Sequence, residues 1–177
     1  LAGMSIGHWF GGHLSETDPT KINRRLAILF GAATCSVILV PFVLRIAAPQ
    51  LLVDGAPFLV SISVLTALLF FLPSVLIACV TPMITKMAID AKPEARGRTL
   101  GRMYALGALG SILGTVAAGF VFISWIGTAG TILSVAAALA IMGAAFAVTA
   151  RHKLTISIVL ALLVIAAVAT ILGRTAF

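Results

Sequence analysis

The sequence predicts an all-α fold: a polytopic membrane helix bundle of about five transmembrane helices, with a partial helix before them. Apolar residues make up 61% of the 177 residues and charged residues only 10%, whereas soluble domains have roughly 45–50% and about 25%. The apolar residues gather in runs long enough for a helix to cross a hydrocarbon core of ~30 Å. The charged residues lie between these runs. We therefore expect a single transmembrane domain over residues 1–177.

The N-terminal part is expected to contain the partial helix and the first full span. Residues 1–14 are apolar and rich in glycine, but too short to cross a membrane. We expect them to be the end of a helix whose beginning precedes Leu1. Asp18 and Pro19 then form a helix-start signal, because Asp can cap a helix and Pro fits its first turn. This signal predicts a span over residues 19–47.

The second span is expected to be long and kinked. Residues 58–89 form an apolar run of ~48 Å as a helix, which is longer than a bilayer core. Pro73 and Pro82 interrupt the run, and proline kinks a helix. We expect residues 83–89 to leave the membrane and residues 90–98 to form a charged loop.

Three further spans are expected in the second half of the chain. Residues 99–125 form one long apolar helix, and the glycines at 127 and 130 predict a tight turn over residues 126–130. An alanine-rich span follows over residues 131–150. A short basic link leads to a nearly pure apolar run over residues 154–172.

The distribution of basic residues predicts an orientation. Ten of the twelve Lys and Arg residues fall in alternate loops, and two fall in the others. The positive-inside rule therefore places the basic loops in the cytoplasm and the C-terminus outside. The most basic loop, here called the basic loop, contains Lys92, Arg96, Arg98 and Arg102. We expect it to face lipid head groups rather than nucleic acid, with an anion site at the following helix start as the weaker alternative.

One helix of the second half carries small residues at four-residue spacing. This small-residue face consists of Gly107, Gly110, Ser111, Gly114, Thr115, Ala118 and Gly119. Small residues allow two helix backbones to approach closely in a membrane. The face predicts tight helix packing, and a partner-docking face or a sliding surface of a transporter is the functional alternative.

A second candidate site lies beside a proline of the kinked span. It consists of Thr81, Pro82, Thr85 and Lys86. Proline leaves a backbone carbonyl without its helical partner, and nearby threonines can bond to it. Broken helices line substrate sites in some transporters, whereas water at the membrane surface could satisfy the same carbonyl. Both interpretations stay open at this point.

The acidic residues argue against catalysis by this chain. They lie in loops or at helix ends: Glu16, Asp18, Asp54, Asp90 and Glu94. Proton relays and cation sites in membranes normally use buried carboxylates. His8 is expected at the membrane surface beside Trp9, and the two cysteines, Cys35 and Cys79, are expected to pack as small apolar residues. We expect no catalytic residue, no cofactor and no metal site.

Two blocks of the sequence resemble a known family. The first is Ser5 to Leu14; the second comprises Thr81 to Met83 and Gly97 to Thr115, and continues to Thr128. Together they resemble the membrane half of the bacterial fused transporter and spermidine-synthase-like proteins, whose membrane helices are major-facilitator-like and precede a cytosolic synthase-like domain. The resemblance covers about residues 3–150. It implies a membrane domain of the bacterial inner membrane, separate from its synthase domain, and no catalytic residue of the family has a counterpart here.

These observations predict a non-catalytic membrane anchor or accessory subunit. Its expected partners are membrane lipids and other protein subunits, in a membrane complex or as a cytosolic synthase-like protein. The alternative is a transporter or half-transporter for polyamines or another small solute. An enzyme acting on lipid is a third and weaker alternative, because His, Asp and Glu are scarce near every span.

Overall fold

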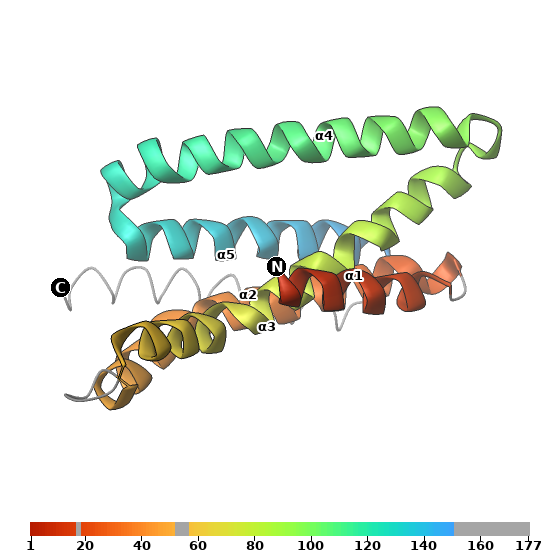
Figure 1. The fold of residues 1–177 in the computed structure, drawn as a ribbon. Coiled ribbons are helices and arrows are strands. Elements are labelled where there is room, and N and C mark those ends of the chain that lie inside the picture. The colour runs from red at the N-terminus through yellow and green to blue at the C-terminus, as the bar shows by residue number, and fades with distance from the viewer. Residues whose placement is uncertain (17–18, 52–56, 151–177) are drawn as a thin grey trace.

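The computed structural model describes residues 1–16, 19–51 and 57–150. This part of the chain is entirely helical, which confirms the predicted all-α class. Its α-helices are α1 (Ala2–Ser15), α2 (Pro19–Leu51), α3 (Phe58–Asp90), α4 (Arg96–Val116) and α5 (Ile123–Thr149), as drawn in Figure 1. A 3-10 turn, Pro93–Ala95, precedes α4, and a π-helical segment, Ala117–Phe122, joins α4 to α5.

The number of helices that could cross a membrane differs from the prediction. The described residues contain three helices that are long and apolar enough: Lys21–Leu51, Phe58–Asp90 and Pro93–Thr149. About five transmembrane helices are predicted for the whole chain and four of them within these residues, so the count here is lower than predicted. Two expected spans, residues 99–125 and 131–150, belong to one helical run of 57 residues. The expected span over residues 154–172 lies outside the described residues.

The 57-residue run is bent back on itself at a single glycine. Helical residues continue through the π-helical segment and into α5, and the non-helical backbone of Gly127 marks a kink between two helices within the predicted turn. A straight helix of this length would measure ~86 Å, far more than a bilayer core of ~30 Å. Gly127 has φ 70° and ψ 178°, a conformation that suits glycine. Figure 1 shows that α4 and α5 both extend from this bend toward the same end of the structure, so that the chain runs in opposite directions along the two helices.

Helix bounds also differ from the prediction at two places. α2 continues through Pro41 and Pro49 to Leu51, beyond the expected end at residue 47. By contrast, α3 is one continuous helix that contains both of its prolines, as predicted, and ends one residue later than expected. α4 begins at Arg96, so the charged stretch expected as a loop over residues 90–98 is partly helical.

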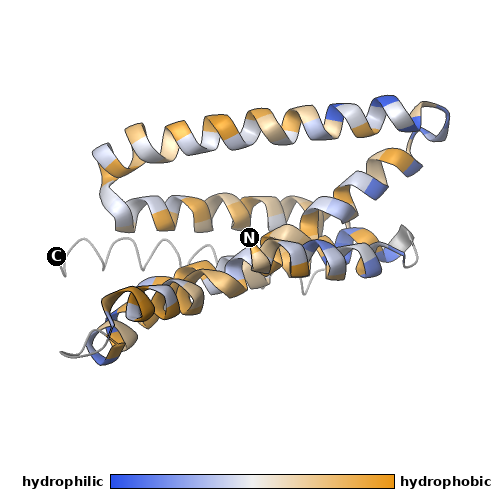
Figure 2. Ribbon diagram, viewed as in Figure 1, coloured by the Kyte–Doolittle hydropathy of each residue, from blue (hydrophilic) through white to orange (hydrophobic). Residues whose placement is uncertain are grey.

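The core lies where α2 contacts α3 and α5. Leu26 of α2 and Met83 of α3 are the largest apolar side chains with no exposed surface, and they share one cluster with Phe30. Phe30 also stacks on Phe146 of α5, with ring centroids 5.7 Å apart. Large apolar side chains elsewhere on the helices are exposed, and Figure 2 shows that hydrophobic residues occur along most of the helix length. A surface of this kind is what lipid covers in a membrane protein.

One end of the structure gathers the starts and ends of helices that carry basic residues. The start of α2, the end of α3 and the start of α4 lie toward the same end in Figure 1. Hydrophilic residues are concentrated there in Figure 2. This end contains Lys21, Arg24 and Arg25 together with the basic loop. The opposite end carries Arg45 and the kink at Gly127.

Candidate functional site

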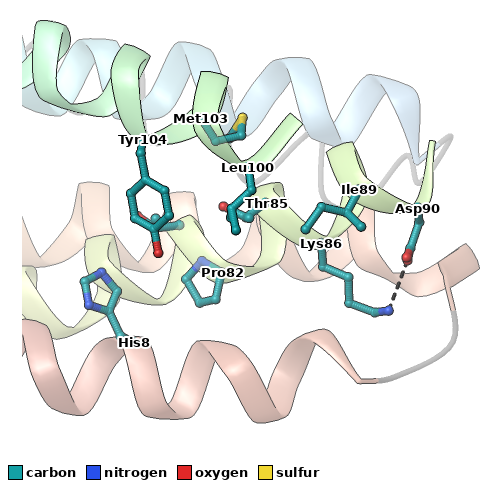
Figure 3. A pocket seen from close by; sticks show the side chains of 10 residues that line it. His8, Pro82, Thr85, Lys86, Ile89, Asp90, Leu100, Met103 and Tyr104 are labelled. Carbon is teal, nitrogen blue, oxygen red and sulfur yellow. Dashed lines mark ion pairs between the residues drawn. The ribbon is translucent and has the colours of Figure 1, made fainter. Parts of the chain in front are cut away.

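A pocket lies between α1, α3 and α4, close to the basic end of the structure (Figure 3). Its volume of about 580 Å³ falls within the range of ~300–1,000 Å³ that is typical of small-molecule sites. The residues that line it are His8, Thr81, Pro82, Thr85, Lys86, Ile89, Asp90, Leu100, Met103 and Tyr104. The structure thus places all four residues of the kinked-helix candidate site in one pocket. It adds residues from α1 and α4 that the sequence pattern did not connect with them.

The α3 wall of the pocket carries hydroxyl groups and an ion pair. Thr81 and Thr85 are one helical turn apart and both line the pocket. Lys86 Nζ lies 3.0 Å from Asp90 Oδ2, in the i,i+4 relation that brings two side chains onto one helix face. The two side chains are 38% and 52% exposed. Such an exposed pair adds little to stability, so its main effect is to hold a charged group at one end of the pocket.

α1 packs so closely on α3 that the two helix backbones are nearly in contact. This packing brings His8 of α1 to the pocket. The buried residues of α1 are Gly3, Gly7, Gly11 and Ser15, which recur every four residues. A Cβ atom added to Gly7 would lie 2.7 Å from Ala78 Cβ. This separation is shorter than real Cβ contacts. Only glycine therefore permits this approach of the two helices.

The sequence carries the signal for this packing in the glycines of α1, but the prediction of tight helix packing is made for the small-residue face instead. Gly3, Gly7 and Gly11 have the same four-residue spacing as the small-residue face of α4. In α1 the stripe contacts α3, whereas Gly107, Gly110, Gly114 and Gly119 each have open space where a side chain would lie. α4 has no buried residue at all. Within the described part of the chain, the small-residue face therefore packs against nothing.

The small-residue face also spans a change of helix type. Its members up to Thr115 lie in the α-helical part of the run. Ala118 and Gly119 lie in the π-helical segment. π-helical turns are rare in proteins, and those that occur are often found at functional sites. The regular four-residue register of the face thus holds from Gly107 to Thr115.

α4 forms the third wall of the pocket through its first turns. Leu100 and Met103 supply apolar surface, and Tyr104 supplies a phenol. Figure 3 shows Tyr104 and His8 extending toward each other from opposite walls. Tyr104 is 73% exposed, so it borders the open side of the pocket. The His8 ring and the Tyr104 hydroxyl can both donate and accept hydrogen bonds at this end.

The surroundings of the pocket are positively charged. All four residues of the basic loop are exposed, and Arg96, Arg98 and Arg102 lie in the first turns of α4. The first turn of α4 has no acidic residue, and its N-cap residue, Ala95, makes no side-chain cap hydrogen bond. The N–H groups at a helix start carry partial positive charge. Helix and side chains therefore contribute the same sign of charge beside the pocket.

A hydrogen bond from α2 fixes the end of α1. Arg25 Nη1 donates to the backbone oxygen of Leu14 at 2.7 Å. The carbonyl groups in the last turn of a helix lack helical partners, and a cation there also interacts favourably with the helix dipole. From the sequence, Arg25 is only one of the basic residues counted between apolar runs. Its contact with α1 depends on a chain reversal that spacing along the sequence does not reveal.

Comparison of the chain with models of protein families, with curated proteins and with solved structures finds no match. The described residues also hold no group of three His, Cys, Asp or Glu side chains that could bind a metal ion. The resemblance to the membrane half of the fused spermidine-synthase-like proteins stays a prediction from sequence motifs. Function is therefore inferred from the geometry of the helices and of the pocket.

Proposed function

We propose that this chain is an integral membrane subunit without catalysis of its own, which docks a partner protein through α4. One observation carries the proposal. α4 has 21 residues, none of them buried, and one side of it presents the small-residue face. A helix with this composition on one side is suited to close contact with another helix.

The chain itself supplies the comparison that supports this proposal. Glycines at the same spacing in α1 lie against the backbone of α3. Lipid chains are as apolar as the helices, so small residues drive association by close packing rather than by a hydrophobic effect. The partner is accordingly a transmembrane helix of another subunit in a membrane complex. The synthase-like protein implied by the sequence resemblance would meet the cytosolic end of such a complex.

The proposed location is the bacterial inner membrane. The start of α2 and the basic loop lie toward the same end of the structure in Figure 1, and both carry basic residues. The positive-inside rule favours this end in the cytoplasm. Membrane lipids then cover the exposed apolar side chains, and the C-terminus lies outside.

Bulky substitutions on two sides of α4 test the docking proposal. Gly114→Ile adds a side chain to the small-residue face, and Ala105→Ile adds one to an exposed position nine residues earlier, which is half a turn away in register. After extraction in mild detergent, we expect the wild type and Ala105→Ile to migrate as a complex on native gels. Gly114→Ile should migrate as the free subunit. Recovery of the wild type as a lone monomer at every detergent strength would contradict the proposal.

A second candidate function is that of a transporter or half-transporter for polyamines or another small solute. The specific observation in its favour is the pocket, which is lined by three helices and by polar as well as apolar residues. Uptake of labelled polyamine into proteoliposomes tests it, with the Leu100→Trp variant, which fills the pocket, as the control. Uptake that is lost in this variant would support transport. Absence of uptake in both protein orientations would count against it.

A further inference from the structure

We propose that the pocket between α1, α3 and α4 binds an amphipathic anion. A phosphate or carboxylate group of the ligand lies at Lys86, and its apolar part lies against Leu100 and Met103. The proposal is separate from docking at α4, since none of the described residues that line the pocket belongs to the small-residue face.

The charges beside the pocket favour an anion. Asp90 is the one carboxylate among the described residues that line the pocket, and it pairs with Lys86 at 3.0 Å, so the two charges balance. The Lys86 ammonium has three donors, and the pair leaves donors that a ligand anion can use beside Asp90. The excess positive charge that favours an anion comes from the start of α4. Arg96, Arg98 and Arg102 begin the neighbouring helix, and their field attracts anions to the pocket.

The shape of the pocket selects for a ligand with an apolar portion. Thr81 and Asp90 are nine residues apart on α3, which places them ~14 Å apart along the helix. Leu100 and Met103 border the space between these levels from the α4 side (Figure 3). A small inorganic ion would leave most of the 580 Å³ unfilled. A ligand that carries an alkyl or aryl group would fill it.

At the end of the pocket away from the Lys86–Asp90 ion pair, side chains that belong to no ion pair in the lining can form hydrogen bonds with a ligand. His8, Thr81 and Tyr104 gather there from three helices. Their ring nitrogens and hydroxyl groups can bond to a hydroxyl or ester group of the ligand. The ligand is therefore polar at two points, with the anionic group at the Lys86 end.

The position of the pocket along α3 leaves two sources for such a ligand. α3 has 33 residues, or ~50 Å of helix, so its last turns extend beyond a hydrocarbon core of ~30 Å. The pocket lies on these last turns, at the level of lipid head groups. Both an anionic phospholipid and a soluble organic phosphate or carboxylate can reach this level.

Calorimetric titration tests the proposal on the full chain in phosphatidylcholine nanodiscs. The probes are dihexanoyl phosphatidylglycerol, hexyl phosphate and, as the cationic control, hexylammonium. We expect at least one anion to bind and hexylammonium to bind more weakly. Tighter binding of the lipid assigns the site to a membrane lipid, and tighter binding of hexyl phosphate assigns it to a soluble solute.

Variants of two lysines show whether the anion binds at the pocket. Lys86→Gln should weaken anion binding about tenfold, the loss expected for one charge-assisted hydrogen bond. Lys86→Arg should restore most of it. Lys92→Gln, which changes an exposed lysine outside the pocket lining, should alter binding less than about twofold, because Lys92 makes no direct hydrogen bond to a ligand at Lys86 and contributes only a long-range charge.

A second pair of variants tests the apolar part independently. Leu100→Trp fills the pocket and should abolish binding, whereas Leu106→Trp, at a 65% exposed position outside the lining of the same helix, should not. Unchanged anion binding in both Lys86→Gln and Leu100→Trp would overturn the proposal. So would hexylammonium binding as tightly as the anions. Either result would leave the docking proposal for α4 unaffected, because that proposal is tested by the size of the complex on native gels.

Discussion

Gly11 of α1 and Pro82 of α3 lie so close together that no side chain fits between them. A Cβ atom added to Gly11 would lie 2.7 Å from Pro82 Cγ. Pro82 also lines the pocket. The contact that brings α1 onto α3 is therefore also a contact that sets the width of the pocket.

Gly11→Ala should destabilise the protein. The added Cβ would force α1 away from α3, and overpacking of this kind costs about 1–3 kcal/mol. Gly12→Ala is the matched control, because a Cβ there meets nothing within 4 Å. Thermal unfolding in detergent, followed by circular dichroism, should show a lower midpoint for Gly11→Ala alone. Equal midpoints for the two variants would disprove the close contact.

Gly127→Ala should also lower the unfolding midpoint, for a backbone reason. Gly127 has φ 70° and ψ 178°, and a side chain in this nearly glycine-only region costs roughly 1–3 kcal/mol. Gly101→Ala is the control, since Gly101 lies in the regular part of α4 with open space around it. In an α-helix, alanine is favoured over glycine by about 1 kcal/mol, so the control should be neutral or slightly stabilised. A neutral Gly127→Ala variant would contradict the kink.

Loss of the Arg25 side chain should loosen the end of α1. Arg25→Gln removes the hydrogen bond to the Leu14 carbonyl, and the expected cost is about 1–2 kcal/mol. Hydrogen exchange in detergent should increase over residues 11–16, which form the last turn of α1 and its cap. Arg24→Gln changes the exposed neighbour and should leave this exchange unchanged. Similar exchange in both variants would refute the capping role.

Met83→Ala should reveal the core between α2 and α3. Met83 has no exposed surface and packs in one cluster with Leu26 and Phe30. Truncation to alanine in a core costs about 2–5 kcal/mol, and we expect the lower end because lipid is itself apolar. Met142→Ala, at a position 54% exposed, should change stability by less than about 0.5 kcal/mol. Unfolding in a titration with sodium dodecyl sulfate measures both, and equal effects would argue against this core.

Composition and local signals predicted part of the fold. The abundance of apolar residues gives the helical class, and a glycine with positive φ lies within the turn predicted over residues 126–130. Thr81, Pro82, Thr85 and Lys86 form a candidate site in the sequence because they surround one proline, and the structure places them in the lining of one pocket. These features depend on residues that are near one another in the sequence. Local patterns are sufficient for them.

The remaining features depend on which helix faces meet. The same four-residue spacing occurs in α1 and α4, but only the glycines of α1 lie against a neighbour. His8 and Tyr104 are 96 positions apart in the sequence, and no periodicity connects them. The helix count differs because hydropathy separates the apolar stretches at residues 99–125 and 131–150, whereas helical residues continue between them except for the kink at Gly127. The spacing of residues along the sequence identifies one face of a helix, but it does not show which other helix packs against that face.

Photocrosslinking from α4 in native membranes tests the proposed docking most directly. A photoreactive residue is placed at Ser111, on the small-residue face, or at Ala105, on the other side of the helix. Mass spectrometry then identifies what each position contacts. We predict protein crosslinks to a transmembrane helix from position 111 and lipid crosslinks alone from position 105. Lipid crosslinks alone from both positions would contradict the proposal that α4 docks a partner.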